Sequence, residues 1–359
     1  MTALRSPRRE PWEDRSDPLS MVDVLRRQAL RAADEEAFLW LENGEREGGR
    51  ITFSTLDLRA RAIAGCALEH GLQGKAVLLA YPSGLDLVAA VFGCFYAGAI
   101  AVVAPLPGAQ SLDRLRLLAI DSSAAGVLTV ASLVEKILDE APAGVRVIAT
   151  DGLDETGDFA LPPTPDPHAL AMLQYTSGST ASPRGVMLSH ANLLANLRAM
   201  AQATRIGEGE TAVSWLPFHH DMGLFGFVLF PVFAGLTSVL MPPVAFLKRP
   251  ARWPEAVHRH RGVLSAGPCF AYDLCARRTT DEERAALDLS SWRVAVCGAE
   301  MIRPEVLERF AATFAPAGFA RSALAPAYGL AEATLLAASV KAEEGFTVQT
   351  VDAPTLAGP

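Results

Sequence analysis

The feature that most constrains the fold of this chain is a repeated alternation between short apolar runs and segments of helical length. Runs such as AVLLAYP from Ala76, IAVVAPL from Ile100 and VAVCG from Val294 are apolar nearly throughout, which is typical of strands buried on both faces. The segments between the runs are long enough for a helix to cross the sheet, so successive strands can pair in parallel. Helices are expected over residues 54–68, with Ser54 as the N-cap, over 85–97 and over 190–203. The pattern therefore predicts an α/β fold with mostly parallel sheets that carry helices on both faces.

A proline-rich run divides the chain into two such units. LPPTPDP at residues 161–167 holds four prolines, and clusters of this kind mark linkers. We expect a mobile lead-in over residues 1–20, a first α/β subdomain over 21–160 and a second over 168–340.

Composition argues against several classes of protein. The formal net charge of -8 would repel a nucleic-acid backbone, and no basic tract offsets it. Residues 87–106 and 223–247 are uncharged and long enough to span a membrane, but glycines and prolines interrupt both stretches, so no membrane span is expected. The first residues contain no signal-peptide core, and the five cysteines form neither a CxxC pair nor a zinc spacing. Buried thiols in a reducing compartment are the simplest interpretation, and we expect a cytoplasmic protein.

A hydroxyl-rich loop is the most informative segment. In LQYTSGSTASPRGVMLSH, residues 173–190, an apolar strand runs into a loop whose hydroxyls and backbone N–H groups can surround phosphate oxygens. The loop residues are Thr176, Ser177, Gly178, Ser179 and Thr180. Arg184 adds a positive charge whose forked donors suit a phosphate group. The lysine and hydroxyl of a P-loop are missing, and a flexible serine and glycine turn is the alternative interpretation.

Five segments, taken in order, resemble a known group of enzymes. YTSGSTASPRGVMLSHANLLAN is similar to the phosphate loop of the adenylate-forming superfamily, which contains acyl-CoA synthetases, luciferases and the adenylation domains of nonribosomal peptide synthetases. WLPFHHDMGLFG, SAGPCFAYDLCARR, VAVCGAEMIRP and AYGLAEATL resemble the fatty acyl-AMP ligases, which transfer acyl groups to carrier proteins. The resemblance covers residues 21–359. It departs from the superfamily at Ala181 and Arg184, where the loop more often reads TGxPKG, and the arginine keeps the charge with a different geometry.

The resemblance implies a nucleotide site and candidate catalytic residues. It places His220 at the border between the ATP site and an acyl tunnel, and it places Tyr328 against the adenine ring. The loop beside the adenine consists of Gly298, Ala299 and Glu300. From the residues alone, a buried histidine with a backbone partner is the alternative for His220. A metal shared by His219 and His220 is the weaker interpretation, because adjacent residues of an extended segment point to opposite faces.

The segment YGLAEAT resembles the magnesium-associated motif of the family. Glu332 is the implied magnesium ligand and Thr334 its support, and Mg²⁺ prefers such oxygen ligands. The neighbouring residues Gly329, Leu330 and Ala331 belong to the same nucleotide-binding motif. The candidate catalytic residues are His220, Glu332 and Arg184. The alternative for Glu332 is a carboxylate that stabilises a helix N-terminus.

An apolar tunnel for an acyl chain is expected near these motifs, because each methylene removed from water contributes about 0.8 kcal/mol. The aromatic candidates for its wall are Phe225, Phe227, Phe230, Phe233, Phe270 and Tyr272. Of these, we assign four to the wall of the tunnel: Phe225, Phe227, Phe270 and Tyr272. We expect two or three aromatic residues to touch a substrate and the rest to pack in the core.

The resemblance implies activation of a fatty acid by ATP, with Mg²⁺, to an acyl-adenylate and pyrophosphate. The acyl group would then pass to a phosphopantetheinylated carrier protein, as in polyketide or lipopeptide biosynthesis. Residues 341–359 resemble the start of the insertion that marks this family, and we expect the chain to lack most of the strand-rich subdomain and the small C-terminal domain with its catalytic lysine. The chain would then be catalytically incomplete. A long-chain acyl-CoA synthetase and a non-catalytic acyl or nucleotide binding module are the alternatives.

Overall fold

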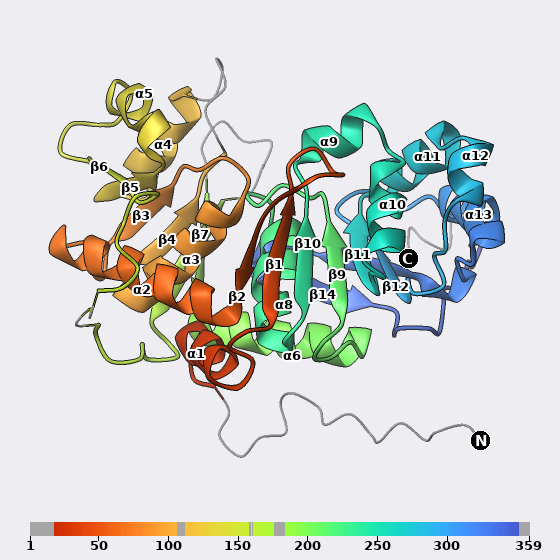
Figure 1. Ribbon diagram of the computed structural model, residues 1–359, viewed down its shortest axis with the longest axis horizontal. Helices are drawn as coiled ribbons and strands as arrows, with labels where there is room; N and C mark the ends of the chain where they lie inside the picture. Colours follow the sequence, from red (N-terminus) through yellow and green to blue (C-terminus); the bar gives the residue numbers. More distant parts are fainter. Residues whose placement is uncertain (1–17, 106–111, 158, 160, 176–183, 352–359) are drawn as a thin grey trace, which may run out of the picture.

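The protein contains two mostly parallel β-sheets that lie side by side (Figure 1). The structure is a computed structural model and describes residues 18–105, 112–157, 159, 161–175 and 184–351. The first sheet has six strands in the order β6-β5-β3-β4-β7-β8 and the second has eight in the order β14-β13-β12-β11-β9-β10-β1-β2. Among the described strands, antiparallel pairing is confined to β7 with β8, β1 with β2 and β13 with β14. The α/β prediction with mostly parallel sheets is confirmed.

The strands are short, as the apolar runs predict. The first sheet consists of β3 (Ala76–Leu79), β4 (Ile100–Val103), β5 (Gly126–Thr129), β6 (Arg146–Ala149), β7 (Leu170–Tyr175) and β8 (Gly185–Ser189). The second sheet consists of β1 (Glu36–Leu41), β2 (Glu47–Thr52), β9 (Thr211–Ser214), β10 (Thr237–Leu240), β11 (Leu264–Gly267), β12 (Val294–Cys297), β13 (Leu324–Gly329) and β14 (Leu336–Ser339).

Helices cover both sheets. They are α1 (Met21–Arg31), α2 (Phe53–Glu69), α3 (Leu85–Ala97), α4 (Leu112–Asp121), α5 (Val134–Leu138), α6 (His190–Thr204), α7 (Asp221–Leu224), α8 (Phe230–Ala234), α9 (Pro243–Lys248), α10 (Arg252–Arg259), α11 (Cys269–Arg278), α12 (Asp281–Ala285) and α13 (Pro304–Phe314). A π-helical segment, Phe225–Leu229, joins α7 to α8, and short 3₁₀ turns lie at Ala131–Leu133, Ala315–Ala317, Arg321–Ala323 and Ala331–Ala333. Among the described residues no helix combines the length and the apolar character that crossing a membrane would require.

The N-cap predicted for α2 is wrong by two residues. The helix begins at Phe53, and the hydroxyl of Thr52 accepts a hydrogen bond from Thr55 N at 3.2 Å. Ser54 lies within the first turn, where its hydroxyl contacts that of Thr52 at 3.0 Å. Thr52 takes the cap because its backbone is still extended, which is the conformation that an N-cap requires.

Strand pairing crosses the predicted boundary between residues 21–160 and 168–340. The hairpin β1–β2 comes early in the chain, but β1 pairs in parallel with β10 of the second sheet. The hairpin β7–β8 follows the proline-rich run, yet β7 pairs with β4 of the first sheet. Each sheet therefore borrows a hairpin from the other half of the chain, because the position of a strand in a sheet depends on tertiary packing and not on its order in the sequence.

The core lies on both faces of the first sheet. Along β3, Val77 and Leu79 join the main core that extends through both sheets, whereas Ala76 and Leu78 join a smaller cluster on the other face, with Leu115 of α4. This alternation is the period of two expected of a strand. The five cysteines are all buried free thiols.

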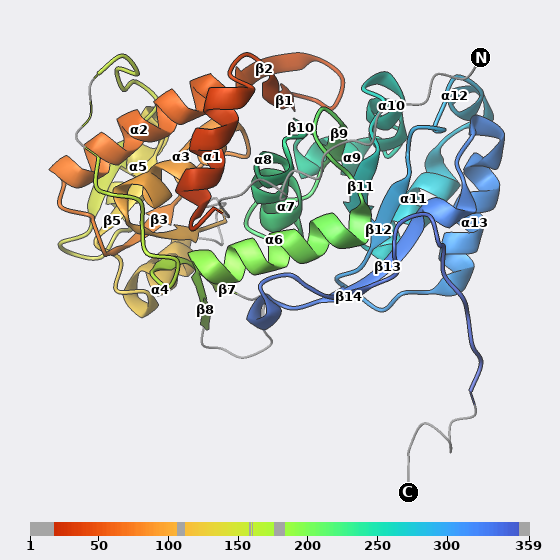
Figure 2. The same cartoon turned by 90° about the horizontal axis from the view of Figure 1, so that it is seen from below.

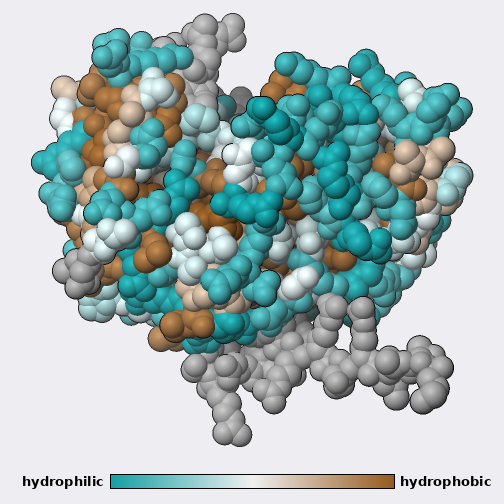
Figure 3. Space-filling view, in the orientation of Figure 1, coloured by the Kyte–Doolittle hydropathy of each residue, from teal (hydrophilic) through white to brown (hydrophobic). Residues whose placement is uncertain are grey.

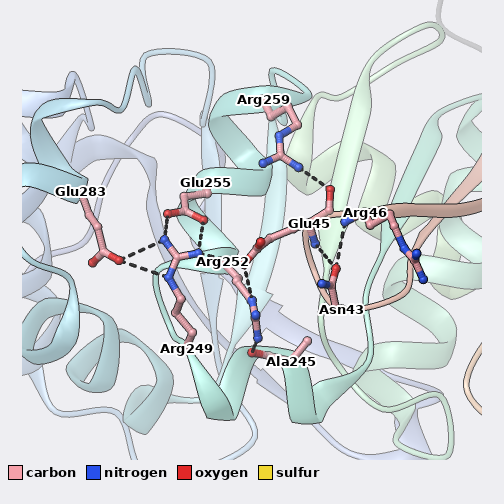
Figure 4. Close-up of polar contacts among 9 residues, drawn as sticks. All are labelled: Asn43, Glu45, Arg46, Ala245, Arg249, Arg252, Glu255, Arg259 and Glu283. Carbon is pink, nitrogen blue, oxygen red and sulfur yellow. Dashed lines mark hydrogen bonds and ion pairs between the residues drawn. The ribbon is translucent and has the colours of Figure 1, made fainter.

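A charged network fixes the β1–β2 turn to the helices of the second sheet. Arg249 contacts Glu45 at 2.9 Å and Glu283 at 3.0 Å, and it also pairs with Glu255, while Arg252 contacts Glu45 at 2.8 Å (Figure 4). Hydrophilic side chains gather over this part of the face (Figure 3). Single exposed pairs contribute little to stability, but here one arginine joins three segments that are far apart in the sequence.

Helix α6 links the two sheets. It begins directly after β8 of the first sheet and runs beneath the second towards β12 and β13 (Figure 2). Ser189 and Asn192 form a capping box at its start. Residues of this one helix therefore lie beside both sheets.

Candidate functional site

A cavity of about 470 Å³ opens at the carboxyl ends of the strands of the second sheet. Most of its wall comes from that sheet, from α6 and from the loops that follow the strands, while Arg114 of α4 and Gln174 and Tyr175 of β7 close it from the side of the first sheet. Ligands of open α/β sheets bind at such strand ends.

The deep part of the cavity is apolar. Alternate residues of three neighbouring parallel strands face it, and these are Leu264 and Ala266 of β11, Val294 and Val296 of β12, and Ala325 and Ala327 of β13. Helix α6 contributes Met200, Ala203 and Thr204, and the hydroxyl of Thr204 is already used because it donates to Met200 O at 2.9 Å. From Val294 to Gly298 the wall follows β12 for about 13 Å, at about 3.3 Å per residue.

The mouth of the cavity is polar and built from loops. Gly298 and Ala299 follow β12, Tyr328 and Gly329 end β13, and the 3₁₀ turn after β13 contributes Glu332. Tyr328 is 65% exposed, so the face of its ring is free to receive a flat partner. Of the predicted nucleotide site, the lining includes Gly298, Ala299, Tyr328, Gly329, Leu330, Ala331 and Glu332.

The turn that carries Glu332 has a tight backbone. Leu330 N donates to Leu335 O at 3.0 Å, which closes the connection between β13 and β14. A Cβ atom at Gly329 would lie 2.2 Å from Leu335 O, so only glycine fits there. Thr334 has φ +72°, a conformation that is unusual for a β-branched residue, and its side chain is buried. Such strain is found where a functional site holds the backbone in place.

Two histidines lie at the edge of the mouth. His220 precedes α7, lines the cavity and keeps an exposed side chain, so the alternative of a buried histidine does not apply. His219 is an exposed residue, and partial desolvation of its ring, with the nearby His220 and Arg114, lowers the pKa of His219 to about 4. His219 is therefore neutral at pH 7. The backbone here is held by Gln174, whose side-chain amide donates to His219 O at 3.3 Å.

No group of three or more histidine, cysteine, aspartate or glutamate side chains within the described part of the chain is arranged to hold a metal ion. Glu332 presents one exposed carboxylate to the cavity. One carboxylate is enough where Mg²⁺ also binds the phosphates of a substrate. The residues present thus fit a metal that arrives with its nucleotide.

The predicted phosphate loop, Thr176 to Thr180, lies outside the described residues. Tyr175, the last described residue before it, donates from its hydroxyl to Asp121 at 2.6 Å, and burial raises the pKa of Tyr175 well above its usual range. Arg184 is exposed and is not part of the cavity wall, whereas Arg114, which the sequence did not indicate, is. Among the described residues, Arg114 is the arginine that lines the cavity.

Several residues predicted for the site lie elsewhere. Glu300 accepts a hydrogen bond from Phe270 N at 2.6 Å, which caps the start of α11 instead of lining the cavity. Of the four aromatic residues assigned to the acyl wall, Phe227 lines the cavity and Phe225, Phe270 and Tyr272 do not. Tyr272 packs in the core, where its hydroxyl donates to Val296 O at 2.8 Å. Thr334 is also absent from the wall.

The aromatic assignments missed most of the apolar wall because small residues form it. Alanines and valines at alternate positions of β11, β12 and β13 leave a space that larger side chains would fill. The period of two was visible in these runs, but which face meets a cavity depends on the neighbouring strands and on α6.

Comparison with known proteins gives consistent results. A family model described as AMP-binding enzyme matches residues 25–357. The medium-chain-fatty-acid (acyl-carrier-protein) ligase JamA of Moorena producens is 39% identical over 348 residues, 94% of this chain and 59% of JamA. The 4-hydroxyphenylalkanoate adenylyltransferase of Mycobacterium tuberculosis is 36% identical over 337 residues, 89% of this chain and 54% of that protein.

A solved structure has the same fold over nearly the whole chain. It is the fatty acyl-adenylate ligase from Legionella pneumophila in complex with acyl adenylate and pyrophosphate, with a TM-score of 0.88 and 36% identity. The match covers 95% of this chain and 60% of that one. The chain thus spans between about half and three fifths of the length of these similar proteins.

Proposed function

Because the chain belongs to the AMP-binding enzyme family, we propose that the complete protein activates the carboxyl group of a fatty acid with ATP. A carboxylate oxygen attacks the α-phosphorus of ATP, the bond from that phosphorus to the bridging oxygen breaks, and pyrophosphate leaves with the bonding electrons. The observation that carries this proposal is one cavity whose apolar depth is continuous with a polar mouth. Such a cavity can hold an alkyl chain and present its carboxylate to a nucleotide.

The mouth has suitable groups for the nucleotide. Tyr328 offers an exposed ring for stacking on adenine, and the backbone of Gly298 and Ala299 lies beside it for the edge of the base. Arg114 and Arg184 supply positive charge for the phosphates, and residues 176–180 supply hydroxyl and backbone N–H donors. No side chain needs to act as a nucleophile, because positioning and charge neutralisation carry this kind of transfer.

Glu332 is the residue that would hold Mg²⁺, with substrate phosphates as its other ligands. The ion would neutralise charge on the phosphate oxygens. His220 lines the cavity, and we assign to it the orientation of the carboxylate of the acid.

The apolar depth suits an alkyl chain. With C–C bonds of about 1.5 Å advancing about 1.25 Å per carbon, a length of about 13 Å holds roughly ten carbons. Decanoate is therefore the first acid to test.

The acyl group then passes to the phosphopantetheine thiol of a carrier protein: sulfur bonds to the acyl carbon and AMP leaves. JamA is named as a ligase of this kind, which supports a carrier protein over CoA as the acceptor. Five buried free thiols suit a reducing cytoplasm.

The proposal is tested by pyrophosphate exchange into ATP with the complete protein. We expect exchange with decanoate and none with amino acids. Exchange that follows only 3-(4-hydroxyphenyl)propanoate would assign the cavity to aryl acids instead, and exchange with no carboxylic acid would reduce the site to a binding module. Product analysis with CoA and with a phosphopantetheinylated carrier protein distinguishes the two acceptors.

A further inference from the structure

One side chain of α6 holds the turn that carries Glu332. The amide nitrogen Nδ2 of Asn196 donates to Ala333 O at 3.0 Å and to Leu336 O at 2.9 Å, and Oδ1 of Asn196 accepts from Leu336 N at 3.0 Å. All three contacts reach across about 140 positions of the sequence. The opposite orientation of the amide would set Oδ1 against two carbonyl oxygens, so these three bonds define one orientation.

The turn needs an external support. Its internal hydrogen bonds run from Leu330 N to Leu335 O, from Ala333 N to Leu330 O and from Thr334 N to Ala331 O, and Thr334 has a positive φ within them. The strand that follows is β14, which lies at the edge of its sheet and pairs only with β13 among the described strands. A strained turn next to an edge strand persists only when its surroundings hold it. Asn196 contacts the turn on both sides of Thr334, at Ala333 and at Leu336.

The same face of α6 also forms the cavity wall. Met200, Ala203 and Thr204 follow Asn196 by four, seven and eight residues, and residues at these spacings share one face of a helix. The helix is capped at its start and packed along its length, so this face is rigid. This face therefore holds the Glu332 turn at a fixed distance from the apolar part of the cavity.

We propose that Asn196 is a positioning residue that sets the Glu332 turn at the correct distance from the bound acyl group. This inference rests on the proposed role of Glu332 with magnesium and ATP. Asn196 acts through the backbone of Ala333 and Leu336, so its loss should reduce the benefit of Mg²⁺ while the apolar part of the cavity keeps its shape.

The test measures ATP affinity by calorimetry, with and without Mg²⁺, in the complete protein. Asn196→Asp is nearly isosteric and keeps the acceptor for Leu336 N, but it places an oxygen against two carbonyls. We expect it to reduce the Mg²⁺-dependent gain in ATP affinity about 10- to 100-fold, as other supports of metal ligands do. Decanoate affinity without nucleotide should remain within about threefold. Gln202→Leu, at an exposed position of the same helix, is the control and should behave like the wild type.

A double variant separates positioning from general damage. If Asn196 acts through Glu332, adding Asn196→Asp to Glu332→Gln should cause little further loss of the Mg²⁺ effect. An unchanged Mg²⁺ effect in Asn196→Asp, or fully additive losses, would overturn the inference. Should Asn196→Asp not fold, Asn196→Ser is measured in the same way. A wild type without any Mg²⁺-dependent ATP binding would instead overturn the proposed function, and the inference with it.

Discussion

The two ends of the cavity are built in different ways. The apolar end consists of regular parallel strands in register, with Leu264 beside Val294, faced by one long helix. The polar end consists of turns, in which Ala299 and Thr334 both have positive φ. Regular strands present a smooth wall for an alkyl chain, whereas irregular backbone can aim N–H groups and a carboxylate at one point. From this difference we infer that the apolar end supplies affinity and the polar end supplies chemistry, and variants at Glu332, Ala203 and Arg114 test that division.

The largest effect is expected at the polar end. Glu332→Gln removes the carboxylate at almost constant volume, and we expect decanoate-dependent pyrophosphate exchange to fall roughly 10²- to 10³-fold. The side chain is exposed, so the unfolding transition should not move. Titration of activity with Mg²⁺ checks the cause, and an unchanged magnesium requirement would return Glu332 to a structural role at the turn.

Filling the apolar end should affect the acid and leave the nucleotide alone. Ala203→Phe extends from α6 into the cavity; displacing about four methylenes at about 0.8 kcal/mol each lowers decanoate affinity by about 200-fold. Hexanoate and ATP affinities should change much less. Ala195→Phe, at an exposed position near the start of the same helix, is the matched control. Equal losses for short and long acids would break the division between the two ends.

Arg114 tests whether the first sheet contributes to the polar end. Loss of one charge-assisted hydrogen bond worth about 1.5 to 3 kcal/mol predicts roughly 10- to 100-fold weaker ATP binding in Arg114→Ala, and we expect the lower value because the side chain is exposed. Arg116→Ala, also exposed on α4, should bind ATP normally. Removal of the charge should also raise the pKa of His219, which NMR titration can follow. An unshifted His219 in Arg114→Ala would mean that Arg114 lies away from the mouth in solution.

The smallest effect concerns the fold and not the cavity. His190 begins α6, is buried, and accepts a hydrogen bond from Met21 N at 3.4 Å, and burial lowers its pKa to about 4 although Asp23 opposes the shift. Between pH 6.5 and about 4 the unfolded chain binds a proton at this ring that the folded chain does not, so stability falls as the pH falls.

From pH 7 to pH 5.5 this histidine should cost about 1 kcal/mol of unfolding free energy. Urea unfolding at the two pH values measures the loss, which should be smaller by that amount in His190→Gln. The same loss in the variant would show that other groups cause the acid sensitivity.

Much of the fold could be read from the sequence because buried parallel strands and capped helices have local signatures. The runs at Ala76 and Ile100 became β3 and β4, and the helix predicted over residues 85–97 has those bounds. The motifs likewise placed Gly298, Tyr328 and Glu332, which the structure brings to one mouth. Their local spacing is enough because each lies at the end of a strand or within the few residues that follow it, and the ends of neighbouring parallel strands meet at one edge.

Only the tertiary structure decided which segments become neighbours. The sequence could not show that β1 pairs with β10, that Glu300 would cap α11, or that small residues on β11 to β13 would leave the apolar space assigned to Phe225, Phe270 and Tyr272. Arg114 and Asn196 carry no local signal either, since each reaches its partners from a distant helix. Hydrophobic pattern and turn chemistry act over a few residues, whereas cavities and long-range hydrogen bonds depend on how whole elements pack.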